Sequence, residues 1–205
     1  MARVAENRAA AQPSSRLQRE KYARMLDAAT KLGSAQQFDQ VQMMDVAEAA
    51  GVAIATLYRY FPSKRHLFVG VMSQQIAGMG MLVERTGDTA TSRSDAAAGA
   101  LVTAMQSFMR RPVLGTSMIR AINSGYGPDA VEAARIEQEF AAVLLRAMAI
   151  EVPSDLERTL IRLLIQQWFG IAQSCVNDHI DREQAESDIR LACELLLAPM
   201  AAGRG

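Results

Sequence analysis

Two phenols, a guanidinium and an ammonium group lie close together near the end of the first third of the chain. They belong to Tyr58, Arg59, Tyr60 and Lys64. We expect Ser63 to cap a helix whose first turn contains Lys64, and the free N–H groups of such a turn favour a bound phosphate. The segment therefore predicts phosphate binding.

The residues before this segment predict two short helices joined by a tight turn. Gly51 stands where the chain must turn, because glycine adopts a positive φ without steric cost. Pro62 disfavours a helical conformation at Phe61, so the second helix should end there. The apolar residues expected to hold the two helices together are Val46, Ala47, Ala50, Val52 and Leu57. This arrangement is a helix-turn-helix, which presents its second helix to the major groove of DNA.

The start of the second helix lacks hydrogen-bonding side chains at the positions that would face base edges. These positions carry Ala53, Ile54 and Ala55. Base recognition would therefore depend on apolar contact with thymine methyl groups. The polar contributions to base recognition would come from Gln42, Thr56 and Arg59.

The run from Gly51 to Leu67 resembles the DNA-binding domain of TetR-type transcriptional repressors. The residues that carry the likeness are Thr56-Leu57-Tyr58, Tyr60-Phe61 and Lys64. The resemblance implies that Thr56, Tyr60 and Lys64 contact backbone phosphates. Packing in the protein interior is an equal alternative for Tyr60, and it is the role we expect for Tyr58.

Two positions depart from the pattern of that family. Its members usually carry Thr or Ser near position 42, which caps the following helix, and often a basic residue near position 44. This chain has Gln42 and Met44 instead. We therefore expect a weaker helix cap and one phosphate contact fewer, although Asp45 can still stabilise the helix N-terminus through the helix dipole.

The composition predicts an all-α protein. Half of the residues are hydrophobic and only 5% are aromatic, without strand-like runs of Val, Ile and Thr. Residues 1–70 carry 10 Lys and Arg against 6 Asp and Glu, whereas residues 71–205 carry 12 against 16. This split fits a DNA-binding part followed by an acidic remainder, with chance fluctuation as the alternative. Without a membrane-spanning apolar run or a signal-peptide core, we expect a cytoplasmic protein with no membrane partner.

Neither a metal site nor a catalytic constellation is predicted. The two histidines, His66 and His179, are far apart, and no phosphate-binding loop, nucleophile elbow or dinucleotide turn occurs. We therefore expect no cofactor and no enzymatic activity. We expect Cys175 and Cys193 to be buried, reduced thiols, and a redox switch is the alternative.

We expect the chain to have three parts. Residues 1–14 should form a disordered arm, residues 15–70 the helix-turn-helix DNA-binding domain, and residues 71–205 a ligand-binding and dimerisation domain. The second boundary lies inside a long helix. We expect Gly33 to end the first helix and Pro199 to end the last one. About nine helices are expected, which matches the TetR-like architecture.

The last two long helices carry apolar side chains on more than one side, which indicates burial on both sides. Two such helices from each of two chains can form a four-helix bundle, and burial within one chain is the alternative. A homodimer would place two recognition helices about 34–36 Å apart on a palindromic operator. The residues expected in the dimer interface are Leu160, Leu164, Gln167, Ile171, Cys175, Ile189, Cys193 and Leu196.

Methionine and aromatic side chains gather on helices of the C-terminal domain that should converge. Methionine adapts to irregular guests, so the group fits an apolar ligand pocket, with ordinary core packing as the alternative for any single residue. TetR-type proteins usually bind a small effector between these helices, and the resemblance implies the same here. The expected pocket residues are Met105, Phe108, Met109, Met118, Ile122, Tyr126, Phe140, Leu144, Trp168 and Phe169.

Most of the chain is also similar to the KstR-type repressors of sterol catabolism in actinobacteria. The similar segments are Gln42-Met43, Thr56 to Lys64, Ala104-Met105-Gln106, Arg110 to Leu114, Arg120-Ala121, Ala147-Met148 and Trp168. This likeness implies a lipid or steroid effector, with a coenzyme A (CoA) thioester as one form. Arg110, Arg111 and Arg120 could then receive its phosphates, with surface solvation as the alternative.

Together these observations predict a ligand-responsive, DNA-binding transcriptional regulator. The form we expect is a repressor released from a palindromic operator by a small hydrophobic effector. One alternative is a lipid-CoA-binding protein or enzyme whose DNA-binding motif is incidental. Another is an architectural protein that binds double-stranded DNA without a ligand, which would show salt-sensitive binding with little sequence preference.

Overall fold

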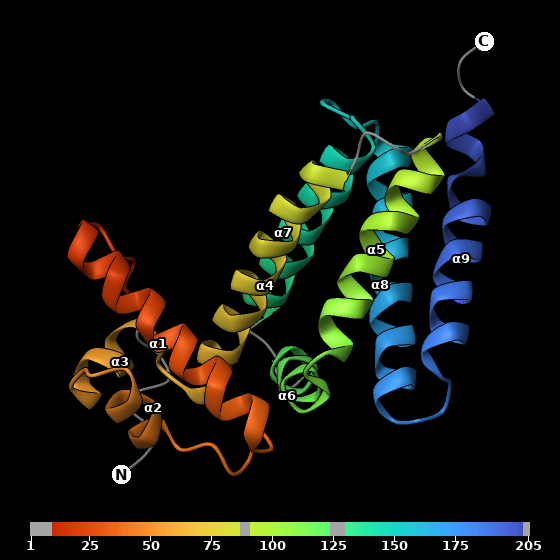
Figure 1. Cartoon of the computed structure of the whole chain (residues 1–205). Coiled ribbons are helices and arrows are strands. Elements are labelled where there is room, and N and C mark those ends of the chain that lie inside the picture. The colour runs from red at the N-terminus through yellow and green to blue at the C-terminus, as the bar shows by residue number, and fades with distance from the viewer. Residues whose placement is uncertain (1–9, 87–90, 124–129, 203–205) are drawn as a thin grey trace. The chain divides into compact units, whose positions relative to one another are not determined.

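Nine α-helices form the part of the chain that the structure describes, which is residues 10–86, 91–123 and 130–202 (Figure 1). In this computed structural model the helices are α1 (Arg16–Ala35), α2 (Met43–Ala49), α3 (Ile54–Tyr60), α4 (Lys64–Thr86), α5 (Arg93–Met109), α6 (Pro112–Asn123), α7 (Ala130–Ala147), α8 (Asp155–Val176) and α9 (Arg182–Ala202). The predicted all-α class and number of helices are confirmed. Within these residues, no helix combines the length and hydropathy needed to cross a bilayer.

The helices pack into two compact units. The first unit contains α1, α2, α3, α4 up to Gln74, and α6. The second unit contains α4 from Gln75, together with α5, α8, α9 and most of α7. The predicted division into residues 15–70 and 71–205 assigned α6 to the C-terminal part, whereas in the structure α6 packs against α1 in the first unit.

The first helix begins at a polar cap and continues past Gly33. The hydroxyl of Ser15 accepts a hydrogen bond from the backbone N–H of Gln18 at 3.2 Å. The predicted helix end at Gly33 is wrong, because this glycine is buried inside α1. A Cβ atom at Gly33 would lie 2.6 Å from Cε1 of Phe68 and 3.0 Å from Cδ1 of Leu114. The glycine therefore permits a close approach of α1 to α4 and α6.

In the second unit, α5, α8 and α9 run side by side (Figure 1). A capping box starts α8: Ser154 and Glu157 each accept the other's backbone N–H with a side-chain oxygen. The indole Nε1 of Trp168 donates to the backbone carbonyl of Leu101 at 3.0 Å, which joins α8 to α5 in the core. The buried side of α9 consists of Ala185, Ile189, Cys193, Leu197 and Met200.

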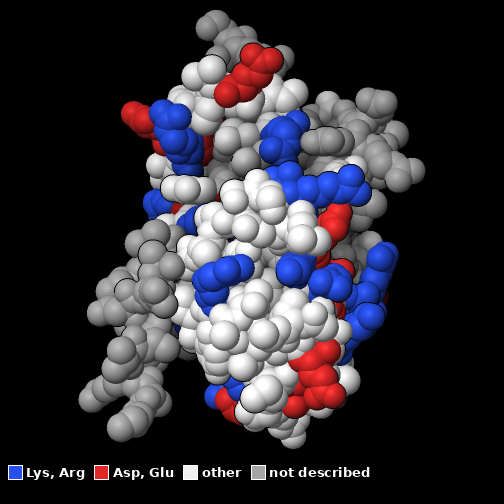
Figure 2. All heavy atoms as spheres, turned by 90° about the vertical axis from the view of Figure 1, so that its left-hand side faces the viewer, with Lys and Arg blue, Asp and Glu red and all other residues white. Residues whose placement is uncertain are grey.

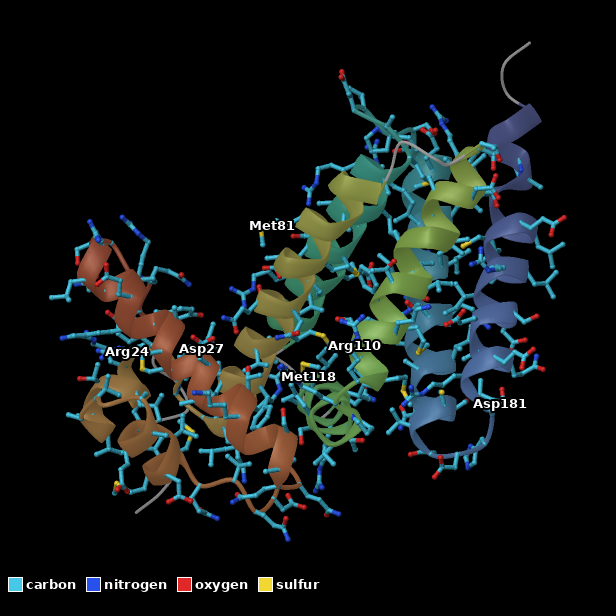
Figure 3. The ribbon with its side chains drawn as sticks, viewed as in Figure 1. Arg24, Asp27, Met81, Arg110, Met118 and Asp181 are labelled. Atoms are coloured by element: carbon cyan, nitrogen blue, oxygen red, sulfur yellow. The ribbon has the colours of Figure 1, made fainter. Side chains whose placement is uncertain are left out.

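The two ends of α9 differ in how well the sequence marks them. Asp181 lies in the turn between α8 and α9 (Figure 3), and its carboxylate accepts from the backbone N–H of Gln184 at 2.8 Å. At the other end the helix contains Pro199 and continues to Ala202, so the predicted end at Pro199 is wrong. The proline removes one backbone donor, and Met200, the residue after it, is buried.

Replacing Gly33 by alanine should destabilise the protein. The new methyl group would lie 2.6 Å from a phenyl ring. Overpacking of this kind costs about 1–3 kcal/mol, which exceeds the roughly 1 kcal/mol that alanine gains over glycine in a helix. Urea unfolding measures the free energy of unfolding. Gly99→Ala in α5 is the matched control, because a Cβ atom there meets nothing within 4 Å and the change should be neutral or stabilising. Equal effects of the two substitutions would contradict the close approach at Gly33.

Candidate nucleic-acid interface and effector site

The two short helices α2 and α3 form the predicted helix-turn-helix. Gly51 joins them with a φ of +63°, a backbone conformation that favours glycine. The backbone N–H of Gly51 donates to the carbonyl of Glu48 at 3.0 Å, and that of Val52 donates to the carbonyl of Ala47 at 3.0 Å. The apolar residues predicted to join the helices include four buried ones, Val46, Ala47, Ala50 and Leu57.

The start of α3 carries small apolar side chains on its exposed side. Ala53 and Ala55 are exposed, and Ile54 and Thr56 are half-buried. No side chain among residues 53–55 can form a hydrogen bond, so this part of the helix offers only apolar contact. The contact of these residues with bases stays a prediction.

Tyr58 lies on the exposed side of α3, so the expected packing of this residue in the core is wrong. Its side chain is 44% exposed, whereas the neighbouring Leu57 is fully buried. Successive residues of a helix are about 100° apart, so the inward position of Leu57 directs Tyr58 outward. Arg59 is exposed as well. The exposed side of α3 therefore has a phenol and a guanidinium group available for DNA.

Tyr60 packs inside the first unit. Interior packing was one of the two roles expected for this residue, and contact with a phosphate was the other. Its side chain is 3% exposed, and its ring lies edge-on against that of Tyr22 with 5.8 Å between the ring centroids. Nη2 of Arg59 donates to the phenol oxygen of Tyr60 at 3.1 Å, and the guanidinium carbon lies 4.8 Å from the ring centroid. Arg59 therefore uses part of its hydrogen-bonding capacity on its neighbour.

A part of the predicted N-terminal arm, residues 1–14, lies against the end of α3. The backbone N–H of Ala11 donates to the carbonyl of Arg59 at 3.0 Å. This bond ties the chain before α1 to the recognition helix. Residues 1–9 of the predicted arm lie outside the described residues.

Lys64, the first residue of α4, holds the loop between α1 and α2. Its Nζ donates to the carbonyl oxygens of Asp39 at 3.1 Å and Val41 at 2.9 Å. Partial burial lowers the pKa of Lys64, the nearby Asp39 charge opposes that shift, and the Arg120 charge adds to it. An ammonium group has three N–H donors, and two of them serve these carbonyl groups. The predicted phosphate contact of Lys64 stays a prediction.

The helix that follows this loop starts without a side-chain cap. Gln42 is the N-cap of α2, with φ −102° and ψ 140°, and it forms no capping hydrogen bond. The weak cap predicted from the missing Thr or Ser is confirmed. Gln42 is exposed, and Asp45 lies in the first turn of α2.

The side of the molecule that carries α1, α2 and α3 has scattered positive charge. Figure 2 shows Lys and Arg side chains spread over this face, some next to one another, with patches of Asp and Glu side chains near its upper and lower ends. Arg24 on α1 is one of the exposed cations (Figure 3). Separate cations can contact separate phosphates, and the uncharged area between them can contact bases.

Four of the predicted pocket residues form an aromatic cluster in the second unit. The cluster consists of Phe108, Phe140, Trp168 and Phe169, and the centroids of its contacting rings are 5.2–6.2 Å apart. All four contacts are edge-on, the geometry that aromatic quadrupoles favour. The cluster therefore joins α5, α7 and α8 through their largest side chains.

The other predicted pocket residues are distributed over the chain. Met105, Met109 and Leu144 are buried in the second unit. Met118 (Figure 3) and Ile122 lie on α6, which belongs to the first unit. Tyr126 lies outside the described residues. The ligand-binding role of all these residues stays a prediction.

A groove with a volume of about 280 Å³ lies between α7 and α8. The residues that line it are Glu137, Gln138, Ala141, Leu145, Arg158, Thr159, Ile161 and Arg162. None of the predicted pocket residues is among them. The lining combines both signs of charge with apolar side chains, so it does not favour one ligand chemistry.

Most of the residues predicted for a dimer interface are buried within the single chain, and their place in a dimer stays a prediction. They are Leu160, Leu164, Ile171, Cys175, Ile189 and Cys193, and each is 9% exposed or less. They face the neighbouring helices of the second unit and leave almost no surface for a second chain. Gln167 is exposed, and Leu196 is half-buried. The exposed leucines of α8 and α9 are Leu156, Leu163, Leu191 and Leu195.

Both cysteines are buried free thiols, as expected. Burial raises the pKa of Cys175 and raises that of Cys193 to about 12. A raised pKa suppresses the thiolate, which is the reactive form in disulfide exchange. This observation argues against the redox alternative. Among the described residues, no three His, Cys, Asp or Glu side chains form a group that could hold a metal ion.

The chain is similar to known regulators over both units. Residues 90–196 match the family described as "Tetracyclin repressor-like, C-terminal domain", and residues 25–71 match "Bacterial regulatory proteins, tetR family". The HTH-type transcriptional repressor KstR of Mycobacterium tuberculosis is 31% identical over 186 residues, which cover 89% of this chain and 83% of KstR.

Solved structures agree with this similarity. A TetR transcriptional regulator from Rhodococcus sp. RHA1 superposes with a TM-score of 0.83 and 45% identity, covering 88% of this chain and 97% of that chain. Thermus thermophilus FadR, crystallised with lauroyl-CoA, shares the fold with a TM-score of 0.65 and 20% identity, covering 86% of this chain and 93% of that chain.

Both resemblances stated from the sequence, to TetR-type and to KstR-type repressors, are confirmed. The matched proteins are regulators of transcription and not enzymes. The helix-turn-helix of the first unit and the C-terminal helices are both accounted for by the same family. The chain therefore belongs to the TetR family of bacterial DNA-binding transcriptional repressors.

Proposed function

We propose that this TetR-family protein is a homodimer that binds a palindromic operator through α3 and releases it when a hydrophobic effector binds. The observation that carries the proposal is the exposed side of α3, where Ala53, Ala55, Tyr58 and Arg59 lie on a helix whose other side is buried. The small apolar side chains would contact thymine methyl groups. Tyr58 and Arg59 would contact phosphates or base edges.

Replacing Ala55 by glutamate should weaken operator binding at least about tenfold, or ~1.4 kcal/mol, because a carboxylate at the start of α3 would repel the phosphates beside the groove. Ala55 is exposed, so the fold should be unaffected. Fluorescence anisotropy with duplex DNA from the region upstream of the gene measures the affinity at fixed salt, with competitor DNA present. Ala134→Glu, at an exposed position of α7, is the control with the same charge. Equal affinities of the two variants would contradict the role of α3.

The proposed effector is a lipid or steroid, either free or as a CoA thioester. The aromatic cluster and the buried methionines of the second unit support an apolar guest. The similarity to KstR and the fold shared with a FadR crystallised with lauroyl-CoA support the same chemical class. Because α4 starts next to α3 and continues into the second unit, a shift of this helix would couple the effector to DNA. The effector can act only through its different affinity for the two states.

Effector binding should change the fluorescence of Trp168, which is the only tryptophan of the chain. Its ring contacts Phe108, Phe140 and Phe169, so a guest that enters among these rings has to separate some of them. Titration with fatty acyl-CoA and steroid-CoA thioesters should change the emission over the concentration range that releases operator DNA. CoA without an acyl group is the control. A compound that releases DNA without changing the emission would contradict a site at this cluster.

The proposed dimer interface is the exposed side of α8 and α9. Leu163, Leu191 and Leu195 are 38%, 53% and 65% exposed there. Gly170 is exposed on the same face as Leu163, about two turns further along α8. A Cβ atom on it would meet nothing within 4 Å, so a partner helix can approach closely. A second copy of the chain would cover these leucines. Two copies would also supply the two recognition helices that a palindromic operator requires.

Replacing Leu195 by glutamate should convert the dimer into a monomer. Leu195 is 65% exposed in the single chain, so a charge there should leave the fold intact and prevent burial against a second copy. Size-exclusion chromatography with light scattering measures the mass. Met81→Glu (Figure 3), at a 64% exposed position of α4, is the matched control and should stay dimeric. A dimeric Leu195→Glu variant would contradict this interface.

A further inference from the structure

The start of α2 depends on contacts from outside the helix-turn-helix. Its N-cap residue, Gln42, forms no capping hydrogen bond, so the first turn of α2 has no side-chain partner for its free N–H groups. The preceding loop, residues 36–42, contains a turn in which the backbone N–H of Gln40 donates to the carbonyl of Gln37 at 2.9 Å. The contacts that hold this loop in place therefore determine the position of the start of α2.

Two cations fix the loop through Phe38 and Asp39. The Nζ atom of Lys64 lies 4.9 Å from the centroid of the Phe38 ring, and Cζ of Arg120 lies 5.5 Å from it. Nη1 of Arg120 also pairs with Oδ2 of Asp39 at 2.7 Å. The ring of Phe38 packs against that of Phe68, with 5.3 Å between the centroids. The loop is thus held to α4 by Lys64 and Phe68, and to α6 by Arg120.

We propose that Arg120 is a positioning residue for operator binding: it holds the loop before α2 and thereby sets the position of α3. This inference rests on the proposed operator binding through α3. Arg120 lies on α6, far along the chain from the helix-turn-helix. Because the turn at Gly51 joins α2 tightly to α3, a displacement of the start of α2 moves the recognition helix with it.

The chemistry of the contact favours arginine. A guanidinium group is planar, so it can donate to a carboxylate and lie over an aromatic ring at the same time. Arg120 does both, with Asp39 and Phe38. These contacts account for the position of Arg120. Binding of an effector phosphate, the role that the resemblance to KstR-type repressors implied, is not needed to explain it.

The test compares Arg120→Ala with Lys31→Ala, which removes the same charge from an exposed residue of the same unit. Arg120→Ala should weaken operator binding about three- to tenfold, the factor expected for a partly exposed ion pair and a cation–π contact. Hydrogen exchange of peptides that cover residues 36–49 should become faster by a similar factor. Lys31→Ala should change neither the affinity for the operator nor the exchange of these peptides. Operator binding is measured with a DNA duplex that the wild-type protein selects from a random-sequence library.

Two further variants separate positioning from other roles. Adding Gln42→Ser to Arg120→Ala supplies the missing cap and should restore slow exchange of these peptides. Asp39→Asn removes the same ion pair by changing the residue in the loop. The test is repeated with this variant if circular dichroism shows that Arg120→Ala is unfolded.

Faster loop exchange together with weaker operator binding, at an unchanged salt dependence, is the expected result. Unchanged exchange overturns the inference. Weaker binding with a salt slope lower by about one unit overturns it as well, because that change indicates a direct phosphate contact. A wild type that selects no duplex would refute the proposed function, and the exchange of residues 36–49 would then decide by itself whether Arg120 holds α2.

Discussion

The close packing of α1 on α4 and α6 is the constraint on which the first unit depends. Gly33 lets the ring of Phe68 approach the backbone of α1, and the same ring supports Phe38 in the loop before α2. Gly70, which is two residues after Phe68 in α4, allows a similar contact. A Cβ atom there would lie 2.9 Å from Cε1 of Phe61. In each case a residue without a side chain admits a rigid ring from another segment. The helix-turn-helix is thereby fixed to the helices that carry it.

Local signals allowed much of this unit to be predicted from the sequence. Gly51 and Pro62 mark the turn and the end of α3 through their own backbone chemistry, which does not depend on distant residues. Gly33 gives the same signal whether it ends a helix or admits a neighbouring ring, so the sequence could not distinguish these roles. The aromatic side chain of Tyr58 favours the core by its residue type, whereas its position directly after Leu57 places it on the exposed side of α3.

Periodicity was less informative for the helices of the second unit. Leu160 and Ile171 belong to an apolar stripe that the sequence analysis assigned to a second chain, yet α8 buries them within its own unit. Spacing shows which residues share a face, but it does not show whether that face meets the same chain or another copy. The proposed interface lies on the same two helices, but on the side that carries their exposed leucines.

Residue type also proved a poor guide to what the cations bind. Arg59 donates to Tyr60, Lys64 donates to two carbonyl groups, and Arg120 pairs with Asp39. The sequence predicts base recognition for Arg59 and a DNA phosphate for Lys64, and it allows an effector phosphate for Arg120. Each of these side chains has a protein partner in the structure. The partners of Lys64 and Arg120 lie far away in the sequence, so only the fold could reveal them. A cation that already has protein partners holds those groups in position, so its effect on DNA recognition includes their arrangement as well as its own charge.

The methyl groups at the start of α3 have a bearing on chemically modified DNA. If α3 enters the major groove as proposed, Ala53, Ile54 and Ala55 meet the edge of a pyrimidine at C5, where thymine carries a methyl group and cytosine a hydrogen atom. Cytosine methylated at C5 carries the same group on the same carbon. A surface that recognises only this group cannot tell the two bases apart by that contact, so the affinity for an operator would depend on the methylation state of its cytosines.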